Sequence, residues 1–198
     1  MLSLPFKKYA ALQLFRAHKA IAHKTHQLNY LFWECTLRCN INCLHCGSDC
    51  TKDAQTADMP AEEFLRAIDS ITPHVNPNKT IIAITGGEPL MRKDLAEIGT
   101  KLHKRGYPWG MVTNGWAMTP DTFNTLLASG LRSITISLDG LEKSHDYFRG
   151  RKNSFCRALG TIRMAASTKD LMYDVMTCAN QQNLSELVQM KDMLIGIG

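Results

Sequence analysis

Residues 39–46, Cys39-Asn40-Ile41-Asn42-Cys43-Leu44-His45-Cys46, place three thiols at the spacing C-x3-C-x2-C. Because the stretch spans only eight residues, its thiols must serve one local site. Thiolates are the usual ligands of iron–sulfur clusters. Three of them would hold three corners of a cubic cluster and leave the fourth iron open to a small molecule. The stretch therefore predicts an iron–sulfur loop around which the chain is organised.

The loop alone is also compatible with a zinc site or with thiols that bind no metal. Five of the seven cysteines lie within residues 35–50, so other triads exist, although only Cys39, Cys43 and Cys46 give C-x3-C-x2-C. A zinc site would be closed by Cys50 as a fourth sulfur ligand, or would use His45 as a substitute. The thiols could instead be buried or reactive ones. The rest of the sequence is needed to distinguish an iron–sulfur cluster, a zinc site and metal-free thiols.

Length and composition are those of a soluble globular domain. The chain has 198 residues, of which 44% are hydrophobic and 21% charged, and a domain of this size buries roughly 70% of its unfolded surface. No apolar run approaches the ~18–20 residues of a membrane span, and the N-terminus has no secretory signal. Clustered thiols without such a signal indicate a reducing compartment. We therefore expect a cytoplasmic protein without a membrane span.

The net charge of +5 is concentrated at the N-terminus. Residues 1–33 contain no acidic residue and five basic ones, which are Lys7, Lys8, Arg16, Lys19 and Lys24. A basic tail suits nucleic acid, a membrane surface or an organelle address. Apolar residues such as Leu12, Phe15 and Ala22 recur at near-helical spacing, however. We therefore predict that residues 1–28 form a basic amphipathic helix packed on a core domain of residues 29–198, and we expect no nucleic-acid partner.

Strand-like and helix-like patterns alternate along the core domain. Short apolar runs predict strands at 30–33, 80–84, 109–112, 133–138 and 171–177. Amphipathic periodicity and capping residues predict helices at 60–71, 93–104, from 119, at 155–167 and from about 184. Five successive strand–helix units imply an α/β fold with a parallel sheet and right-handed crossovers.

The fourth predicted strand distinguishes an open, doubly wound sheet from a barrel-like one. Its residues 134, 136 and 138 are apolar, whereas 133, 135 and 137 are Ser, Thr and Ser. A strand covered by helices on both sides should be apolar on both faces. A small polar face instead suggests a lumen with room for a ligand. We therefore predict a partial TIM-type barrel with five of the usual six units, preceded by the N-terminal helix.

Each unusual polar stretch follows the end of a predicted strand. These stretches are the cysteine loop, Gly86–Pro89, Thr113–Gly115, Ser137–Gly140 and Thr177–Asn180. Gly, Asn and Asp dominate ordinary turns, so each stretch alone is weak evidence of a site. The carboxyl ends of parallel strands form one rim, and α/β proteins build their sites there. The five stretches together therefore predict one site.

Two motifs carry a resemblance to a known family. Cys39-x3-Cys43-x2-Cys46 after the first strand and Gly86-Gly87-Glu88-Pro89 after the second make the chain similar to the radical S-adenosylmethionine (SAM) enzymes over roughly residues 29–195. A zinc module has no use for the glycine pair and the acid that follow forty residues downstream. The resemblance thus strongly favours the iron–sulfur interpretation.

The resemblance implies a role for each matching residue. Cys39, Cys43 and Cys46 would bind a 4Fe–4S cluster, whose fourth iron would bind the methionine part of SAM. His45 would lie against the adenine. Gly86 to Pro89 would approach the methionine ammonium group, since glycines permit close backbone approach, and Glu88 would shape or neutralise the pocket.

The remaining matches are expected on the other side of the pocket. Ser137 and Arg149 match positions that hold a carboxylate in peptide-modifying members, and we expect them to support SAM binding. A surface ion pair with Asp146 is the alternative role for Arg149. Thr113, Asn114 and Asp139 are weaker candidates for lining the pocket or binding the ribose.

The resemblance also implies a reaction. A reductant such as ferredoxin or flavodoxin would deliver an electron through the cluster to SAM. The products are methionine and a 5′-deoxyadenosyl radical, which abstracts hydrogen from a substrate. The stretches 137–140, 145–150 and 183–187 look most like the SPASM-type peptide and protein maturases, and enzymes of cofactor biosynthesis are the alternative within the family. The alternatives outside it are a zinc-stabilised interaction module and an iron–sulfur electron carrier.

The C-terminal end of the chain departs from the family pattern. Relatives continue beyond the fifth unit with a sixth strand and a C-terminal domain. Substrate-side catalytic residues commonly lie there, so none is assigned in this chain. We expect the fifth strand to have an open edge and the core to be incomplete as a catalyst, unless the N-terminal helix or a second copy covers that edge.

Overall fold

The computed structural model describes residues 5–198, with the exception of the side chain of Thr25. Its centre is one sheet of five parallel strands in the order β1-β2-β3-β4-β5. The strands are β1 (Tyr30–Glu34), β2 (Ile81–Thr85), β3 (Trp109–Thr113), β4 (Leu131–Ser137) and β5 (Met172–Met176). A doubly wound sheet reverses its strand order at one point. This sheet does not, and the predicted barrel-like α/β fold is confirmed.

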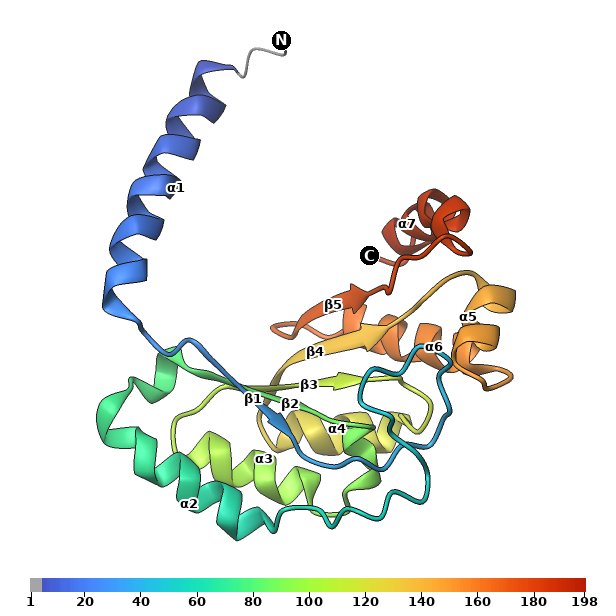
Figure 1. Cartoon of the computed structure of the whole chain (residues 1–198), viewed down its shortest axis with the longest axis horizontal. Helices are drawn as coiled ribbons and strands as arrows, with labels where there is room; N and C mark the ends of the chain where they lie inside the picture. Colours follow the sequence, from blue (N-terminus) through green and yellow to red (C-terminus); the bar gives the residue numbers. More distant parts are fainter. Residues whose placement is uncertain (1–4) are drawn as a thin grey trace.

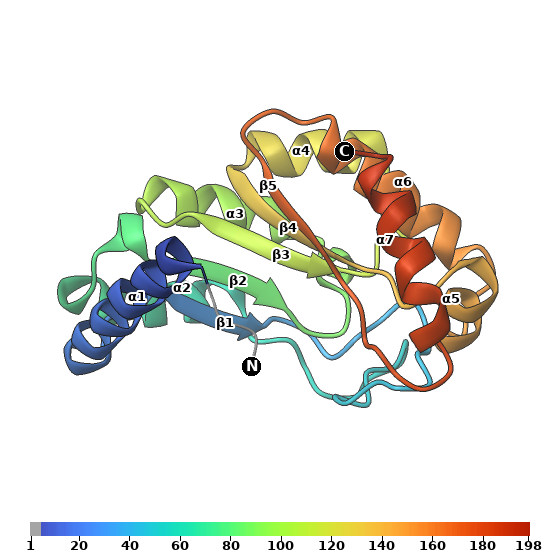
Figure 2. The ribbon, with the colours of Figure 1, turned by 90° about the horizontal axis from the view of Figure 1, so that it is seen from above.

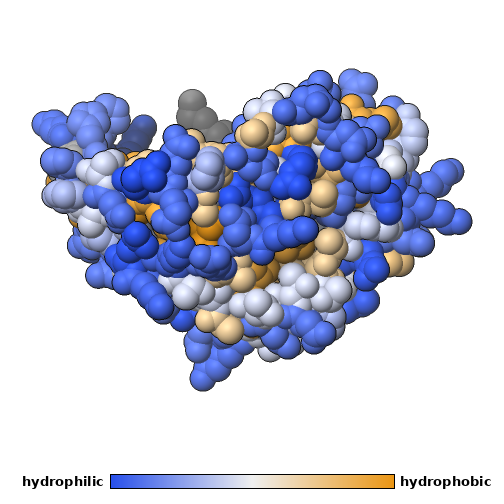
Figure 3. Space-filling view, turned by 90° about the horizontal axis from the view of Figure 1, so that it is seen from below, coloured by the Kyte–Doolittle hydropathy of each residue, from blue (hydrophilic) through white to orange (hydrophobic). Residues whose placement is uncertain are grey.

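Helices cover one face of the sheet (Figure 1). The crossover helices are α2 (Ala61–Ile71), α3 (Leu95–Lys104), α4 (Pro120–Ala128) and α6 (Ser154–Ala166). The remaining helices are α1 (Phe6–Thr25), α5 (Glu142–Phe148) and α7 (Leu187–Ile195). The outward surface of the helical layer is mostly hydrophilic, with apolar groups visible in strips between polar ones (Figure 3). No helix within residues 5–198 is long and apolar enough to cross a membrane.

The two faces of β4 confirm the alternation seen in the sequence. Ile134 and Ile136 point to the helices and are fully buried, while Thr135 and Ser137 on the opposite face are half-buried. Strand register continues that inner face across the sheet, since Phe32, Ala83, Gly110, Ser133 and Met172 form one row. Figure 2 looks onto this inner face. The side chains of Phe32 and Met172, on the two edge strands, are 69% and 66% exposed.

The structure differs from the sequence prediction at two helices. The predicted N-terminal helix is present as α1, while residues 1–4 of the prediction lie outside the described residues. The helix projects from the body instead of packing on it (Figure 1). Its side chains Phe6, Leu14 and Ile21 are 83%, 74% and 66% exposed, so the predicted packing is wrong. The second difference is α5, which the sequence patterns did not predict. At seven residues, it is too short to show a helical period.

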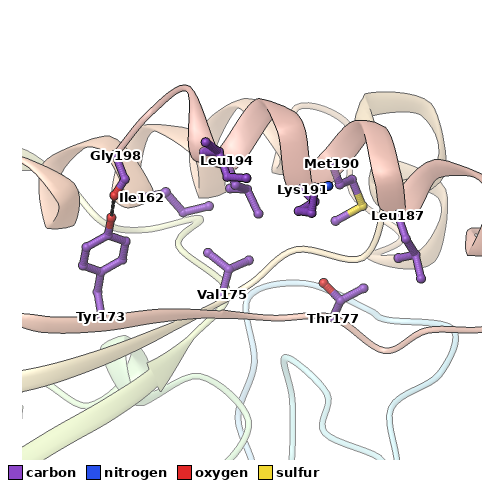
Figure 4. Close-up of a pocket in the computed structure, with 10 residues that line it drawn as sticks. Ile162, Tyr173, Val175, Thr177, Leu187, Met190, Lys191, Leu194 and Gly198 are labelled. Carbon is purple, nitrogen blue, oxygen red and sulfur yellow. Dashed lines mark hydrogen bonds between the residues drawn. The ribbon is translucent and has the colours of Figure 1, made fainter. Parts of the chain in front are cut away.

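β5 is an edge strand, as predicted, and α1 lies at the opposite end of the sheet beside β1 (Figure 1). The face of β5 that carries Tyr173, Val175 and Thr177 lies opposite α7. A cavity of about 370 Å³ separates the two elements (Figure 4). The hydroxyl of Tyr173 donates a hydrogen bond to the carbonyl of Gly198 at the rim of this cavity.

Candidate functional site

The backbone of the cysteine loop contacts two other segments, one at Thr51 and one at residues 148–150. The Cys39 amide donates to the Thr51 carbonyl at 3.0 Å, and the Leu44 amide donates to the Phe148 carbonyl at 2.8 Å. Gly150 lies directly against the loop, because a Cβ atom there would approach the Asn42 carbonyl oxygen to 2.2 Å. The loop thus rests on the C-terminal end of α5, and its shape depends on that unpredicted helix.

The glycine pair fits the same loop from the other side. A Cβ atom on Gly86 would lie 2.3 Å from the Thr36 carbonyl oxygen, and one on Gly87 would lie 2.3 Å from the Arg38 carbonyl oxygen. The Gly87 amide donates to the Thr36 carbonyl at 2.7 Å, and Gly86 has a φ of 135°. Both positions therefore require glycine, because the backbone of residues 36–38, which leads into Cys39, lies too close for a side chain.

Glu88 lies beneath the site with its side chain fully buried. Its carboxylate accepts hydrogen bonds from the Thr113 hydroxyl at 2.8 Å, the Asn114 amide at 2.8 Å and the Leu90 amide at 3.2 Å. Burial raises the pKa of Glu88 to about 6, against the opposing effect of these hydrogen bonds. Glu88 thus fastens the end of β3 to the loop after β2.

These segments enclose a cavity of about 210 Å³ at the carboxyl ends of β1 to β4. Most of the predicted site residues line it. We call this set the cavity wall, and it consists of Cys39, Cys43, His45, Cys46, Gly86, Gly87, Thr113, Asn114, Ser137 and Arg149. The other three predicted residues, Glu88, Pro89 and Asp139, are buried and are not among its lining residues.

Asp139 connects the wall to the interior. Its Oδ2 lies 2.7 Å from Arg149 Nη2 and 3.1 Å from His45 Nε2, and its Oδ1 accepts from the Cys178 amide at 2.9 Å. Arg149 therefore pairs with Asp139 and not with Asp146. The geometry supports a positioning role for Asp139, whereas a direct contact with ribose stays a prediction.

Two buried residues beside Asp139 lie in stretches that the sequence analysis compared with the family, but neither residue was predicted to belong to the site. His145, on α5, accepts a hydrogen bond at Nδ1 from the Asp139 amide at 3.0 Å. Burial lowers the pKa of His145 to about 4, and the Arg149 guanidinium adds to that effect. Asn183 donates to the carbonyls of Asp139 and Cys178. We call Glu88, Pro89, Asp139, His145 and Asn183 the buried layer.

Within the cavity wall, the side chain of Asn114 contacts the cysteine loop at Cys39. Its Nδ2 donates to Asn40 Oδ1 at 2.8 Å and lies 3.7 Å from Cys39 Sγ, while its Oδ1 accepts from the Trp116 amide. On the opposite side, Arg149 Nη1 lies 3.6 Å from Cys43 Sγ. Two of the three predicted ligand sulfurs thus have a donor side chain beside them, a contact that tunes cluster potentials in iron–sulfur proteins.

The cysteines differ in exposure and in whether they border the cavity. Cys46 is exposed and Cys43 half-buried, and both line the cavity, whereas Cys35 is 1% exposed and lies in the main core. Burial raises the pKa of Cys35 to about 12. Cys50 is also buried, but it packs against Cys39 and borders the cavity. Cys39 is also buried, but it lines the cavity, whereas Cys35 does not, so Cys35 cannot present its thiol to a group held in the cavity.

The unpaired polar atoms around the cavity indicate which kind of ligand it could hold. Within residues 5–198, no three His, Cys, Asp or Glu side chains converge as the ligands of a single ion do. In the part of the chain that the structure describes, His45 Nδ1 and Arg149 Nε, on two lining residues, and Asn40 Nδ2, on the neighbour of Cys39, are buried without hydrogen-bond partners. Buried polar groups normally have partners. Unpaired nitrogens beside three thiols are therefore consistent with a ligand that offers acceptors.

The chain belongs to the radical SAM superfamily, whose model matches residues 33–194. Enzymes of this family use a 4Fe–4S cluster and SAM. The AdoMet-dependent heme synthase of Methanosarcina barkeri is 30% identical over 167 residues, which cover 84% of this chain and 47% of the synthase. The PqqA peptide cyclase of Ruegeria pomeroyi is 25% identical over 83% of this chain and 43% of the cyclase.

The fold matches that of a solved relative. The crystal structure of Streptococcus suis SuiB bound to the precursor peptide SuiA superimposes with a TM-score of 0.71 at 18% sequence identity. The match covers 100% of this chain and 43% of SuiB. The chain thus spans less than half the length of the relatives named here. At this identity the superposition establishes the fold alone.

Proposed function

We propose that this chain forms the SAM-cleaving core of an enzyme that abstracts hydrogen from a peptide or protein substrate. The observation that carries the proposal is the cavity wall, in which the three thiols, the glycine pair and Arg149 surround one cavity. The cluster and SAM, when bound, supply the radical that starts the reaction. The protein's part is to hold both and to keep water away.

Each wall residue has a task in this proposal. Cys39, Cys43 and Cys46 hold the cluster, and the buried Nε of Arg149, together with the Ser137 hydroxyl, is available to a carboxylate of SAM. A guanidinium suits a carboxylate because it forms charge-assisted hydrogen bonds. The backbone of Gly86 and Gly87 borders the same cavity and leaves room for the ammonium group.

The inner face of the sheet offers a place for the substrate. It adjoins the cavity at Ser137, and it carries exposed apolar side chains on both edge strands. A peptide is the substrate class we propose, which agrees with the names of the PqqA peptide cyclase and of the SuiB complex with its precursor peptide. A carboxylated tetrapyrrole is the second candidate, because the relative at 30% identity is a heme synthase.

The proposed reaction is tested by anaerobic reconstitution with iron and sulfide, followed by chemical reduction in the presence of SAM. We expect 5′-deoxyadenosine and methionine to accumulate, and Cys46→Ala to abolish both products. Cys156→Ala is the matched control, because Cys156 is an exposed thiol on α6 away from the cavity. An active Cys46→Ala variant, or an inactive wild type with a complete cluster, would contradict the proposal.

Binding measurements separate the two substrate classes. Precursor-like peptides should protect the inner face in hydrogen exchange, and the added substrate should raise the rate of 5′-deoxyadenosine formation. A carboxylated tetrapyrrole that binds the same face, while peptides leave it unprotected, would assign the second candidate.

A further inference from the structure

The segment that follows α5 is rich in basic residues. Residues 147–169 contain no Asp or Glu and six basic residues, which are Arg149, Arg151, Lys152, Arg157, Arg163 and Lys169. Arg149 forms an ion pair with Asp139 inside the site. The other five are exposed, and no ion pair is formed by any of them within residues 5–198.

Two of these arginines lie on the same tryptophan. The guanidinium carbon of Arg151 lies 4.3 Å from the Trp116 ring centroid, and that of Arg157 lies 5.8 Å from it. The nearest acidic residue that precedes them in the chain, Asp146, already has other hydrogen-bond partners. The Asp146 carboxylate accepts from the backbone amides of Asn153 and Phe155 and from the Ser154 hydroxyl. Both guanidinium groups are thus ordered by stacking and free to pair with an external acid.

Trp116 connects this surface to the cysteine loop. Its side chain packs against the cluster of apolar residues that contains Cys39 and Ile41. Its amide donates to Asn114, whose side chain reaches Cys39 Sγ. The two arginines therefore stack on an aromatic side chain that itself packs against the apolar residues of the cysteine loop.

We propose that Trp116, Arg151 and Arg157 form the docking surface for a small acidic electron-carrier protein. The inference rests on the proposed function, which requires an electron at the cluster. Opposite surface charge steers such a partner and fixes its orientation. Nucleic acid is less suited, because it requires many phosphate contacts along a stripe, whereas the two stacked cations here share one tryptophan that packs against the cysteine loop. We name these three residues the docking patch.

The test follows the rate of cluster reduction, which needs neither SAM nor substrate. The reconstituted protein is mixed anaerobically with reduced flavodoxin, and the loss of cluster absorbance is recorded by stopped flow. We expect the double variant Arg151→Glu/Arg157→Glu to be reduced at least about tenfold more slowly than wild type, since charge steering changes association rates by roughly 10- to 1,000-fold. The wild-type rate should fall steeply with added salt.

Two controls separate charge from structure. Arg163→Glu reverses one charge on the helix that carries Arg157. Arg163 lies six residues beyond Arg157, about 240° around the helix axis, so this variant should reduce the rate less than twofold. Arg151→Lys/Arg157→Lys keeps both charges and should retain most of the rate. Dithionite, a small reductant that needs no docking, should reduce the cluster of every variant at the wild-type rate.

Failure of the docking proposal is distinguishable from failure of the proposed function. If no cluster forms, or if dithionite cannot support SAM cleavage in wild type, the proposed function is wrong. If dithionite works but flavodoxin reduces the Glu double variant as fast as Arg163→Glu, the docking proposal is overturned. Loss of RNA affinity in the double variant at an unchanged flavodoxin rate would also overturn it and assign the patch to nucleic acid.

Discussion

The cavity wall and the buried layer contain residues from the same sequence motifs, yet they do different work. Gly86 and Gly87 border the cavity, whereas Glu88 and Pro89, the next two residues, are buried beneath it. Likewise, Ser137 lines the cavity, whereas Asp139, two residues later, is buried. Wall residues present atoms to a ligand, and residues of the buried layer hold the wall in place through hydrogen bonds. A functional motif is thus partly a binding motif and partly a structural one.

The largest effect is expected from the glycine pair. An alanine at Gly86 or Gly87 would push its Cβ into a backbone carbonyl 2.3 Å away, and Gly86 would also be strained by its positive φ. Because backbone cannot yield as a side chain does, we expect each variant to lose more than about 3 kcal/mol of unfolding free energy. Urea denaturation of the apoprotein measures this loss.

Gly47→Ala is the matched control for the glycine pair. Gly47 also borders the cavity, but nothing lies within 4 Å of a Cβ atom built there. Its stability should change by less than about 0.5 kcal/mol. Equal stability of Gly86→Ala and Gly47→Ala would show that the close approach to residues 36–38 is not a constraint.

His145 should make the apoprotein less stable in acid. Its pKa is lowered from 6.5 to about 4 in the fold, so below pH 6.5 the unfolded chain binds the proton and the folded chain does not. The unfolding free energy should therefore fall by about 3 kcal/mol between pH 6.5 and pH 4 from this group. His145→Asn offers an acceptor in place of Nδ1 and should remove this part of the pH dependence. An unchanged pH profile would contradict the burial of His145.

Glu88 should act in the opposite direction and more weakly. Its pKa is raised from 4.5 to about 6, so the folded chain binds the proton more readily over that interval. The contribution is present below pH 4.5 and is lost as the pH rises through 6, which amounts to about 2 kcal/mol. The difference between wild type and Glu88→Gln, measured by denaturation at each pH, isolates it. A stability of wild type relative to Glu88→Gln that stays constant or decreases as the pH falls from 6 to 4.5 would refute the assignment.

Ser137 offers the smallest and most specific test of the wall. Ser137→Ala should weaken SAM binding by about tenfold while stability and cluster content stay unchanged, since a single hydroxyl bonded to a carboxylate lies at the lower end of the about 1.5–3 kcal/mol that hydrogen bonds to charged groups contribute. Arg149→Ala should weaken binding by roughly ten- to a hundredfold, but it also leaves the buried Asp139 carboxylate without its closest partner. Calorimetric titration with SAM measures both. Unchanged affinity in both variants would remove them from the SAM site.

The sequence predicted the five strands, the common rim and the cysteine loop, because apolar periodicity and clustered thiols are local signals. The division between wall and buried layer was not predictable, because the direction of the Glu88 and Asp139 side chains depends on contacts with distant segments. His145 was missed for the same reason. The packing of α1 was predicted wrongly, since its apolar residues lie on two sides of the helix, with Leu14 and Ile21 on one side and Leu12 and Phe15 on the other.

The central claim is that Cys39, Cys43 and Cys46 hold a cluster with one iron open to SAM. The most direct test is electron paramagnetic resonance of the reduced cluster with and without SAM, in wild type and in single cysteine variants. We expect SAM to shift the spectrum of wild type and of Cys50→Ala, and each variant of the three ligands to lack the cluster. A spectrum indifferent to SAM, or a cluster lost in Cys50→Ala but retained in Cys39→Ala, would contradict the account.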